Sequence, residues 1–321
     1  MTSKPYGLVA DIGGTHARFA VAALEGEGAI REPRTFAVAD HKNVDDAARE
    51  FLSTEGLAHP PEALVFAVAG PVTGGRIHFT NSGWAFSEGE LRKTLGVKRA
   101  RLVNDFEAQA RAVAVLKPAA LLRIGGPEAF DPRADGTIAL VGPGTGLGVG
   151  GLARKGGASI ALVSEGGHAG FAPVDETDVT ILEALRKKFD RVSAERLLSG
   201  PGLANLFEAM SGKTPPAPEE ITARAKSDPK SFEGQVFARF CAILGSVAGD
   251  VALVMGARSG VVLAGGILPN AVELLQASDF RARFEDKGRF ADYLRAIPTR
   301  LIVEPHAGLI GAASILQHAD Q

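Results

Sequence analysis

The sequence predicts an α/β fold built from two related halves. Apolar runs rich in Val, Ile and Phe alternate with segments of helical periodicity, which is the pattern of an α/β protein. Two segments, LVADIGGTHARFAVAAL at 8–24 and IALVGPGTGLGVGGL at 138–152, share the order strand, Gly-Thr turn, strand. Glycine makes up 39 of the 321 residues, well above the usual share of about 7%. The paired glycine hairpins predict two lobes that face one another across a cleft able to hold a nucleotide.

In the first half of the chain, each expected element has a local reason. Residues 7–12 form an apolar run typical of a buried strand, the two glycines that follow make its turn, and residues 19–24 pair back. Ser87 is expected to start a helix, because Glu90 stands at the capping-box position three residues later. The other elements expected here are a helix at 45–57, strands at 63–69 and 101–103, and a helix after Asn104-Asp105.

In the second half, a domain change is expected near residue 115, and a new alternation of strands and helices follows it. Residues 137–141 and a run of small residues ending at Leu152 are expected to form the second hairpin. Residues 260–264 are expected to form a strand that ends in Gly265-Gly266. The remaining expected elements are strands at 121–124 and 301–303, helices at 177–188, 193–198, 203–210 and 232–255, and a terminal helix.

The composition limits the class of partner. The chain has 35 Lys and Arg against 37 Asp and Glu, a formal net charge of −2. It therefore lacks the excess of positive charge by which nucleic-acid-binding proteins displace counterions from phosphates. The lone cysteine, Cys241, excludes an internal disulfide, which is typical of the reducing cytoplasm. The N-terminal apolar run is broken by Asp11, so no membrane anchor is expected. We therefore expect a cytoplasmic protein that binds small molecules and neither nucleic acid nor membrane.

The two glycine turns are candidates for binding phosphate. A phosphate needs backbone N–H groups in a concave turn, and glycine permits the close approach. Thr15 and Thr145 add hydroxyl donors beside these turns. The alternative is that each turn merely closes a β-hairpin. Asp11, at the strand end before the first turn, is placed to hold Mg²⁺ through water, or alternatively to cap the N–H groups of that turn.

Asn104 and Asp105 end an apolar strand, where α/β folds present polar groups to a ligand. An aspartate in this place can accept the proton of an attacking hydroxyl during phosphoryl transfer. The alternative is that Asp105 is the N-cap of the helix that follows. Residue chemistry alone leaves both roles open.

Glu165 and His168 flank two glycines after an apolar stretch at 160–163. Glu-x-x-His on a helix can form half of a metal site, but the central glycines predict a loop. A loop carboxylate and imidazole suit the recognition of sugar hydroxyls. Glu195 has the pattern of an acidic side chain in the first turn of a helix, and residue chemistry does not single it out.

Six segments, taken in order, resemble those of the bacterial glucokinase family. They are LVADIGGTHARFA, LVNDFEAQA, VGPGTGLGVGG, SEGGHAGFAP, VSAERLLSGPGLANLF and GVVLAGGILP, which span residues 8–269; FRARFEDKGRF at 280–290 is similar as well. The resemblance implies the two-lobed actin-like ATPase (ribonuclease H-like) fold of sugar kinases. It also implies transfer of the γ-phosphoryl group of ATP to the 6-hydroxyl of glucose, the first step of glycolysis. No cysteine lies between His168 and Cys241, so the chain resembles the type without a zinc motif.

The resemblance further implies a role for each candidate residue. Asp105 would be the catalytic base. The sugar hydroxyls would be bound by Asn104, Asp105, Glu165, His168 and Glu195. The nucleotide would be bound by Ala10, Asp11, Ile12, Gly13, Gly14 and Thr15 as the first phosphate segment, by Gly144 and Thr145 as the second, and by Gly265 and Gly266 on the adenosine side.

The same resemblance implies ATP and Mg²⁺ as cofactors and a homodimer. It implies a small domain at 1–115, completed by 304–321, and a large domain at 116–303. The chain departs from the family pattern at Ala10, His16 and Gly170, where Gly, Asn and an acidic residue are expected, and these departures bear on nucleotide affinity. Two alternatives remain: a kinase for another hexose, and a catalytically silent sugar-sensing protein of the same fold, which the retention of Asp105 disfavours.

Overall fold

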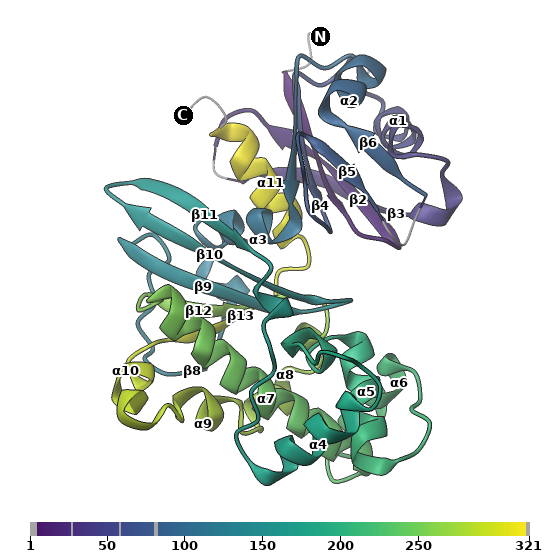
Figure 1. The fold of residues 1–321 in the computed structure, drawn as a ribbon. Helices are drawn as coiled ribbons and strands as arrows, with labels where there is room; N and C mark the ends of the chain where they lie inside the picture. The colour runs from purple at the N-terminus through teal and green to yellow at the C-terminus, as the bar shows by residue number, and fades with distance from the viewer. Residues whose placement is uncertain (1–4, 27, 58, 80–82, 319–321) are drawn as a thin grey trace. The chain divides into compact units, whose positions relative to one another are not determined.

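The computed structural model describes residues 5–26, 28–57, 59–79 and 83–318, which form two units (Figure 1). Unit 1 contains the described residues up to Lys117 and those from Glu304 onward, and unit 2 is Pro118–Val303. Each unit has its own sheet and its own core. The expected α/β class is confirmed in both.

The sheet of unit 1 has five strands in the order β3-β2-β1-β4-β7. β1 pairs antiparallel with β2 and parallel with β4, and β4 pairs parallel with β7. These strands are β1 Tyr6–Ile12, β2 His16–Ala23, β3 Ile30–Ala37, β4 Ala63–Val68 and β7 Arg99–Asn104, and a separate hairpin joins β5 Arg76–His78 to β6 Ala85–Ser87.

Helices cover both faces of this sheet, which is why its central strands are almost entirely apolar. Successive residues of β1 point to opposite faces, so Leu8 belongs to one apolar cluster and Val9 to the other. Phe51 of α1 (Val44–Thr54) and Leu91 of α2 (Glu88–Leu95) complete the first cluster. Helices α3 (Asp105–Val113) and α11 (Ala307–Gln317) complete the second.

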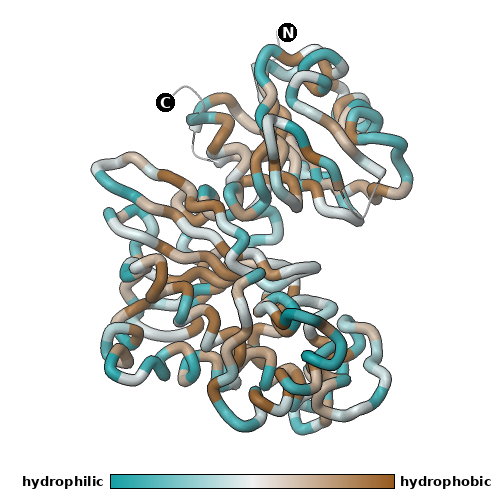
Figure 2. Tube along the Cα trace, in the orientation of Figure 1, coloured by the Kyte–Doolittle hydropathy of each residue, from teal (hydrophilic) through white to brown (hydrophobic). Residues whose placement is uncertain are grey.

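The sheet of unit 2 has six strands in the order β11-β10-β9-β12-β13-β8. β9 pairs antiparallel with β10 and parallel with β12, while β13 pairs parallel with β12 and antiparallel with β8. Figure 2 shows apolar residues along these strands. The strands are β8 Leu121–Gly125, β9 Gly136–Pro143, β10 Leu147–Lys155, β11 Ala158–Ser164, β12 Gly260–Leu263 and β13 Thr299–Ile302.

Helix α7 (Phe232–Met255) forms the centre of the unit 2 core. By length and composition alone it is the one helix of the described part of the chain that could cross a membrane, but 67% of its most apolar window is buried. Burial raises the pKa of its Cys241 to about 12, so this thiol stays protonated. The other helices are α4 Glu176–Arg186, α5 Gly200–Ser211, α6 Pro218–Ser227, α8 Val272–Gln276, α9 Phe280–Glu285 and α10 Ala291–Arg295.

The two sheets share one plan, which confirms the expectation of two related halves. In unit 1 the hairpin β1–β2 lies beside the parallel strand β4, and in unit 2 the hairpin β9–β10 lies beside the parallel strand β12. The strand orders β3-β2-β1-β4-β7 and β11-β10-β9-β12-β13 therefore correspond position by position. Both glycine turns connect equivalent strands.

Most expected elements are confirmed, because their signals are local. The strands at 7–12, 63–69, 137–141 and 260–264 are present, and the helix at 232–255 has the expected bounds. Ser87 is the N-cap of α2, and its Oγ accepts from the N–H of Glu90 at 3.3 Å and donates to its carboxylate at 2.7 Å.

The structure also contains elements that were not expected, among them β5, β6, β11 and α8–α10. Two other differences have a clear local cause. The helix expected at 193–198 is only a 3₁₀ turn, Ala194–Arg196, because Ser199 caps α5 and Pro201 lies in its first turn, which forces a new helix to begin. Strand β3 was not expected. It is an exposed edge strand whose sequence IREPRTFA carries charges and a proline, a composition that protects an edge and hides the strand pattern.

Candidate functional site

The candidate residues of unit 1 lie at the carboxyl ends of three parallel strands. Ile12, Val68 and Asn104 are paired in register at the ends of β1, β4 and β7. Since neighbouring strands are about 4.8 Å apart, the β1–β2 turn and Asn104 are separated by roughly 10 Å along this edge. The structure thus brings the first phosphate segment and Asn104-Asp105 to one edge of one sheet.

The β1–β2 turn is tight and exposed. The N–H of Gly13 donates to the carbonyl of His16 at 2.9 Å, and the carbonyl of Thr15 accepts from the N–H of Val38 at 2.9 Å. Both residues 15 and 16 are exposed, so the Thr15 hydroxyl can meet a ligand. His16 already belongs to β2, so this strand begins three residues earlier than expected.

Asp11 lies beside this turn in a partly buried position. Its carboxylate accepts a hydrogen bond from Arg18, directly opposite on β2, at 3.3 Å. Burial raises the pKa of Asp11, and the Arg18 guanidinium and the His306 ring oppose that rise. A Cβ at Gly308 would lie 2.9 Å from the Asp11 carboxylate, so the first turn of α11 packs directly against it. The Arg18 contact was missed by sequence reasoning, although the register of the hairpin would have paired the two residues.

Asn104, rather than Asp105, caps helix α3. The side chain of Asn104 accepts from the N–H of Phe106 at 2.9 Å and donates to the carbonyl of Gly70 at 3.2 Å. The alternative reading of Asp105 as the N-cap is therefore wrong. Asp105 is the first residue of α3, where a negative charge interacts favourably with the helix dipole. Asn104 supplies the capping group, because its backbone is extended while that of Asp105 is already helical.

The β9–β10 turn of unit 2 is closed by a hydrogen bond from the N–H of Gly144 to the carbonyl of Gly146 at 2.8 Å. Thr145, at its tip, is exposed. Gly265, which follows β12, has a φ of +84°, and a Cβ there would lie 2.3 Å from the carbonyl oxygen of Pro143. Only glycine permits this approach, so Gly265-Gly266 is adjacent to the second phosphate segment.

Glu165 precedes a single 3₁₀ turn, Gly166–His168, and His168 is its last residue, within a segment where the sequence predicted a loop. A Cβ at Gly167 would lie 2.0 Å from the carbonyl oxygen of Leu147, so the glycine lets this turn pack on β10. Glu165 is exposed, and the side chain of His168 is 59% exposed. We call residues 165–168 the sugar turn, after the role expected from the sequence.

Glu195 joins the sugar turn to the β9–β10 turn. Its Oε2 accepts from the N–H of Leu147 at 2.8 Å, and its Oε1 lies 3.7 Å from Nδ1 of His168. Glu195 does occupy the first turn of a short helix, as its residue pattern indicated, but its carboxylate contacts groups far away in sequence. Leu147 contributes only a backbone N–H, which no sequence pattern reports.

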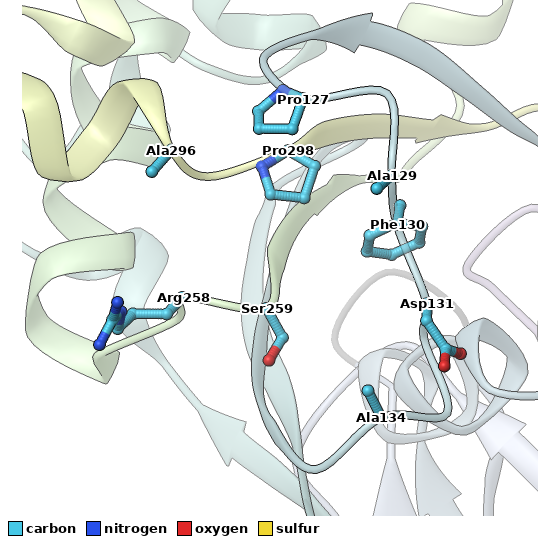
Figure 3. A pocket seen from close by; sticks show the side chains of 9 residues that line it. All are labelled: Pro127, Ala129, Phe130, Asp131, Ala134, Arg258, Ser259, Ala296 and Pro298. Atoms are coloured by element: carbon cyan, nitrogen blue, oxygen red, sulfur yellow. The ribbon is translucent and has the colours of Figure 1, made fainter.

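A cavity of about 360 Å³ lies elsewhere in unit 2. Figure 3 shows Pro127, Phe130, Ser259 and Pro298 around it. Ser259 and Pro298 precede β12 and β13, so the cavity is at the amino ends of these strands. The β9–β10 turn and Gly265-Gly266 are at the carboxyl ends of β9 and β12 in the same sheet. Within unit 2, the cavity is therefore at the opposite end of these strands from the β9–β10 turn.

The chain is similar to known glucokinases over nearly its full length. The profile of a family described as Glucokinase matches residues 8–319. A glucokinase of a Caulobacter species is 47% identical over 319 residues, which are 98% of this chain and 95% of that protein. A glucokinase of Xanthomonas oryzae pv. oryzae is 44% identical over 325 residues, with 97% and 95% of the two chains covered.

Solved structures agree with these sequence matches. The crystal structure of a glucokinase from an Antarctic psychrotroph has a TM-score of 0.86 and 36% identity, and the match covers 98% of this chain and 100% of that one. A glucokinase from Balamuthia mandrillaris in complex with glucose has a TM-score of 0.80 at 20% identity, with 98% and 94% covered. A ROK family glucokinase from Streptomyces griseus in complex with glucose and AMPPNP has a TM-score of 0.63 at 18% identity, with 97% and 98% covered, and supports the fold.

Proposed function

The chain belongs to the glucokinase family, and from this premise we propose how its residues divide the work of phosphorylating glucose with ATP. Its fold is the actin-like ATPase fold of sugar kinases. The reaction is the ATP-dependent conversion of glucose to glucose 6-phosphate, the first step of glycolysis. The observation that supports the residue roles best is the pair of glycine turns on equivalent strands. Glu195 links the second of them, the β9–β10 turn, to His168.

Three backbone segments hold the nucleotide in this proposal. Residues 10–15 and the pair Gly144-Thr145 offer amide and hydroxyl donors to the phosphates, and Gly265-Gly266 lies on the adenosine side. Asp11 fits a water-mediated Mg²⁺ site, because magnesium in kinases is held by one or two carboxylates together with phosphate oxygens. A bound Mg²⁺ would neutralise charge on the β- and γ-phosphates.

Asp105 acts as the general base. Its carboxylate orients the 6-hydroxyl of glucose and accepts its proton as the new O–P bond forms and the bond from the γ-phosphorus to ADP breaks. Asn104 binds a sugar hydroxyl while its own bonds to Phe106 and Gly70 fix the end of β7. The support for these roles is the position of both residues at the same sheet edge as the first phosphate turn.

Glu165, His168 and Glu195 recognise the sugar. Two carboxylates can each accept from sugar hydroxyls, and an imidazole can donate or accept. The nearby Glu195 carboxylate favours the tautomer of His168 that carries its proton on Nδ1, and Nε2 can then accept a hydrogen bond from a sugar hydroxyl. We further propose that the enzyme is cytoplasmic, in line with its lone cysteine. That it works as a homodimer is proposed from the family resemblance alone.

A coupled ADP-release assay with Mg-ATP and a panel of hexoses tests this function. Glucose should give the highest kcat/KM, with mannose and fructose poorer. Another hexose that is preferred by more than about tenfold, or about 1.4 kcal/mol, would instead favour the alternative of a kinase for that hexose. Sugar binding without any turnover would favour the sugar-sensing alternative.

Glu165→Gln and His168→Ala should each raise the KM for glucose far more than the KM for ATP. Each change removes a hydrogen bond to a sugar hydroxyl, worth about 0.5–1.5 kcal/mol when neutral and about 1.5–3 kcal/mol when charged. Steady-state kinetics with each substrate varied in turn measures the two constants. Equal rises in both would show that the sugar turn has a structural role only.

Gly146→Ala should raise the KM for glucose, although residue 146 lies in the phosphate turn. A Cβ at this position would lie 2.5 Å from Oε2 of Glu195, so the carboxylate must leave the Leu147 N–H and shift relative to His168. The expected rise is roughly tenfold, the value of one charged hydrogen bond.

Gly144→Ala is the matched control, because a Cβ there has nothing within 4 Å. It should affect the KM for ATP and leave the KM for glucose within about twofold, since its Cβ meets no sugar residue. If Gly146→Ala behaves like Gly144→Ala, then Glu195 does not depend on the turn.

A further inference from the structure

A cluster of four charged residues lies at the start of α4, and the reaction above uses none of them. We call Asp175, Asp178, Arg239 and Arg283 the arginine clamp. Asp178 is fully buried, and its carboxylate accepts from Arg239 at 3.1 Å and from Arg283. Asp175 accepts from the same arginines at 2.7 and 2.9 Å. Although burial alone would raise the pKa of Asp175, hydrogen bonds from Arg239 and the Asp178 N–H hold it below its usual value.

The two arginines come from a tightly packed helix pair, α7 and α9 (Figure 1). A Cβ at Gly245 of α7 would lie 2.1 Å from the carbonyl oxygen of Phe280, so the helix backbones touch. Nε of Arg283 also donates to Oγ of Ser246 at 2.9 Å. Arg283 belongs to the segment FRARFEDKGRF, which resembles the glucokinase family but contains no residue with a role in the reaction above. The cations are thus fixed, and the carboxylates of α4 are held against them.

A short path of hydrogen bonds connects the clamp to the sugar turn. The carboxylate of Asp178 accepts from the N–H of Val174 at 3.2 Å, so the clamp holds the residue that precedes the N-cap of α4. Only two residues separate Val174 from Phe171, whose N–H donates to the carbonyl of Val192 at 3.0 Å. The carbonyl of Ala169 accepts from the N–H of Ala194 at 2.9 Å. The path ends at His168 and Glu195, the neighbours of Ala169 and Ala194.

We propose that Arg283 and Arg239 are positioning residues for glucose, which hold the sugar turn and Glu195 in place through Asp175, Asp178 and the start of α4. This inference rests on the proposed sugar-binding roles of His168 and Glu195. A buried carboxylate is stable only when it is paired with charged hydrogen-bond donors. Loss of an arginine hydrogen bond would therefore favour a conformation in which Asp178 is more exposed to water, and this movement would shift the backbone at Val174. The nucleotide segments Gly144-Thr145 and Gly265-Gly266 follow β9 and β12, and the path meets the β9–β10 turn at its far end, where Glu195 accepts from the N–H of Leu147.

Arg283→Lys tests the proposal, with Arg281→Lys as its matched control. Lysine keeps the positive charge, but it cannot donate the bidentate hydrogen bonds of a guanidinium. Both arginines lie on α9 with side chains that are 12% and 18% exposed, but Arg281 bonds to Glu285 and to the carbonyl of Ile297, not to α4. Arg283→Lys should raise the KM for glucose, and the Kd for glucose measured by calorimetry without ATP, by about 3- to 20-fold. The KM for ATP should change less than twofold, and Arg281→Lys should leave both KM values unchanged.

Asp175→Asn provides a milder second variant. Asparagine still caps α4 through the N–H of Asp178, while the bonds to both arginines lose their charge. It should shift glucose affinity in the same direction as Arg283→Lys. Equal changes in the two KM values, or equal effects of Arg281→Lys and Arg283→Lys, would reduce the clamp to a stability element and overturn the proposal. If His168→Ala itself leaves the KM for glucose unchanged, the proposed sugar site fails instead.

Discussion

Replacing Asp105 with Asn is expected to lower kcat by about 10²–10⁴-fold, the usual cost of losing a general base. The amide keeps the shape of the side chain and its acceptor for the N–H of Phe106, but it cannot take the proton from the sugar hydroxyl. Glucose binding should be largely retained. Steady-state kinetics, combined with calorimetric titration of glucose, separates the loss of turnover from loss of binding.

Glu107→Gln is the control for this substitution. It makes the same acid-to-amide change in the first turn of α3, at a residue whose carboxylate pairs with Arg101 at 2.9 Å. Its kcat should stay within a few-fold of the unmodified enzyme. A kcat for Asp105→Asn within that same range would show that Asp105 contributes only to the start of the helix.

Gly311→Ala is expected to destabilise unit 1 by about 2–3 kcal/mol, the cost of overpacking a tight contact. A Cβ at residue 311 would lie 1.8 Å from the carbonyl oxygen of Ala108, so α11 would have to move away from α3. Because α3 begins with Asp105 and the first turn of α11 packs on Asp11, kcat should fall as well. Denaturant unfolding and kinetics on the same preparation give both quantities.

Gly89→Ala provides the opposite expectation within the same unit. Gly89 is exposed in helix α2, and a Cβ there would only come within 4.0 Å of the Arg92 side chain. Alanine should therefore stabilise the helix by up to about 1 kcal/mol and leave kcat unchanged. Similar stability changes for the two variants would contradict the close packing of α11 on α3.

Local signals in the sequence predicted the parts of the site whose structure is set by residues adjacent along the chain. The apolar run before Asp11 and the two glycines after it predicted the first hairpin, and the matching pattern before Gly144 predicted the second. The polar pair Asn104-Asp105 was expected at a strand end for the same reason. Which of the two caps α3 was not predictable, because both residue types make good caps and the choice depends on where the backbone turns helical.

By itself, the sequence determined the α/β class, the doubled hairpin plan and the family, because these follow from periodicity and from motifs whose residues are neighbours along the chain. Only the tertiary structure decided which distant groups touch. The carboxylate of Glu195 meets the N–H of Leu147, Arg283 meets Asp178, and Gly311 lies against the backbone of Ala108. Such contacts arise when packed helices and strands bring backbone groups and charges within hydrogen-bond distance, and no local pattern encodes the partner.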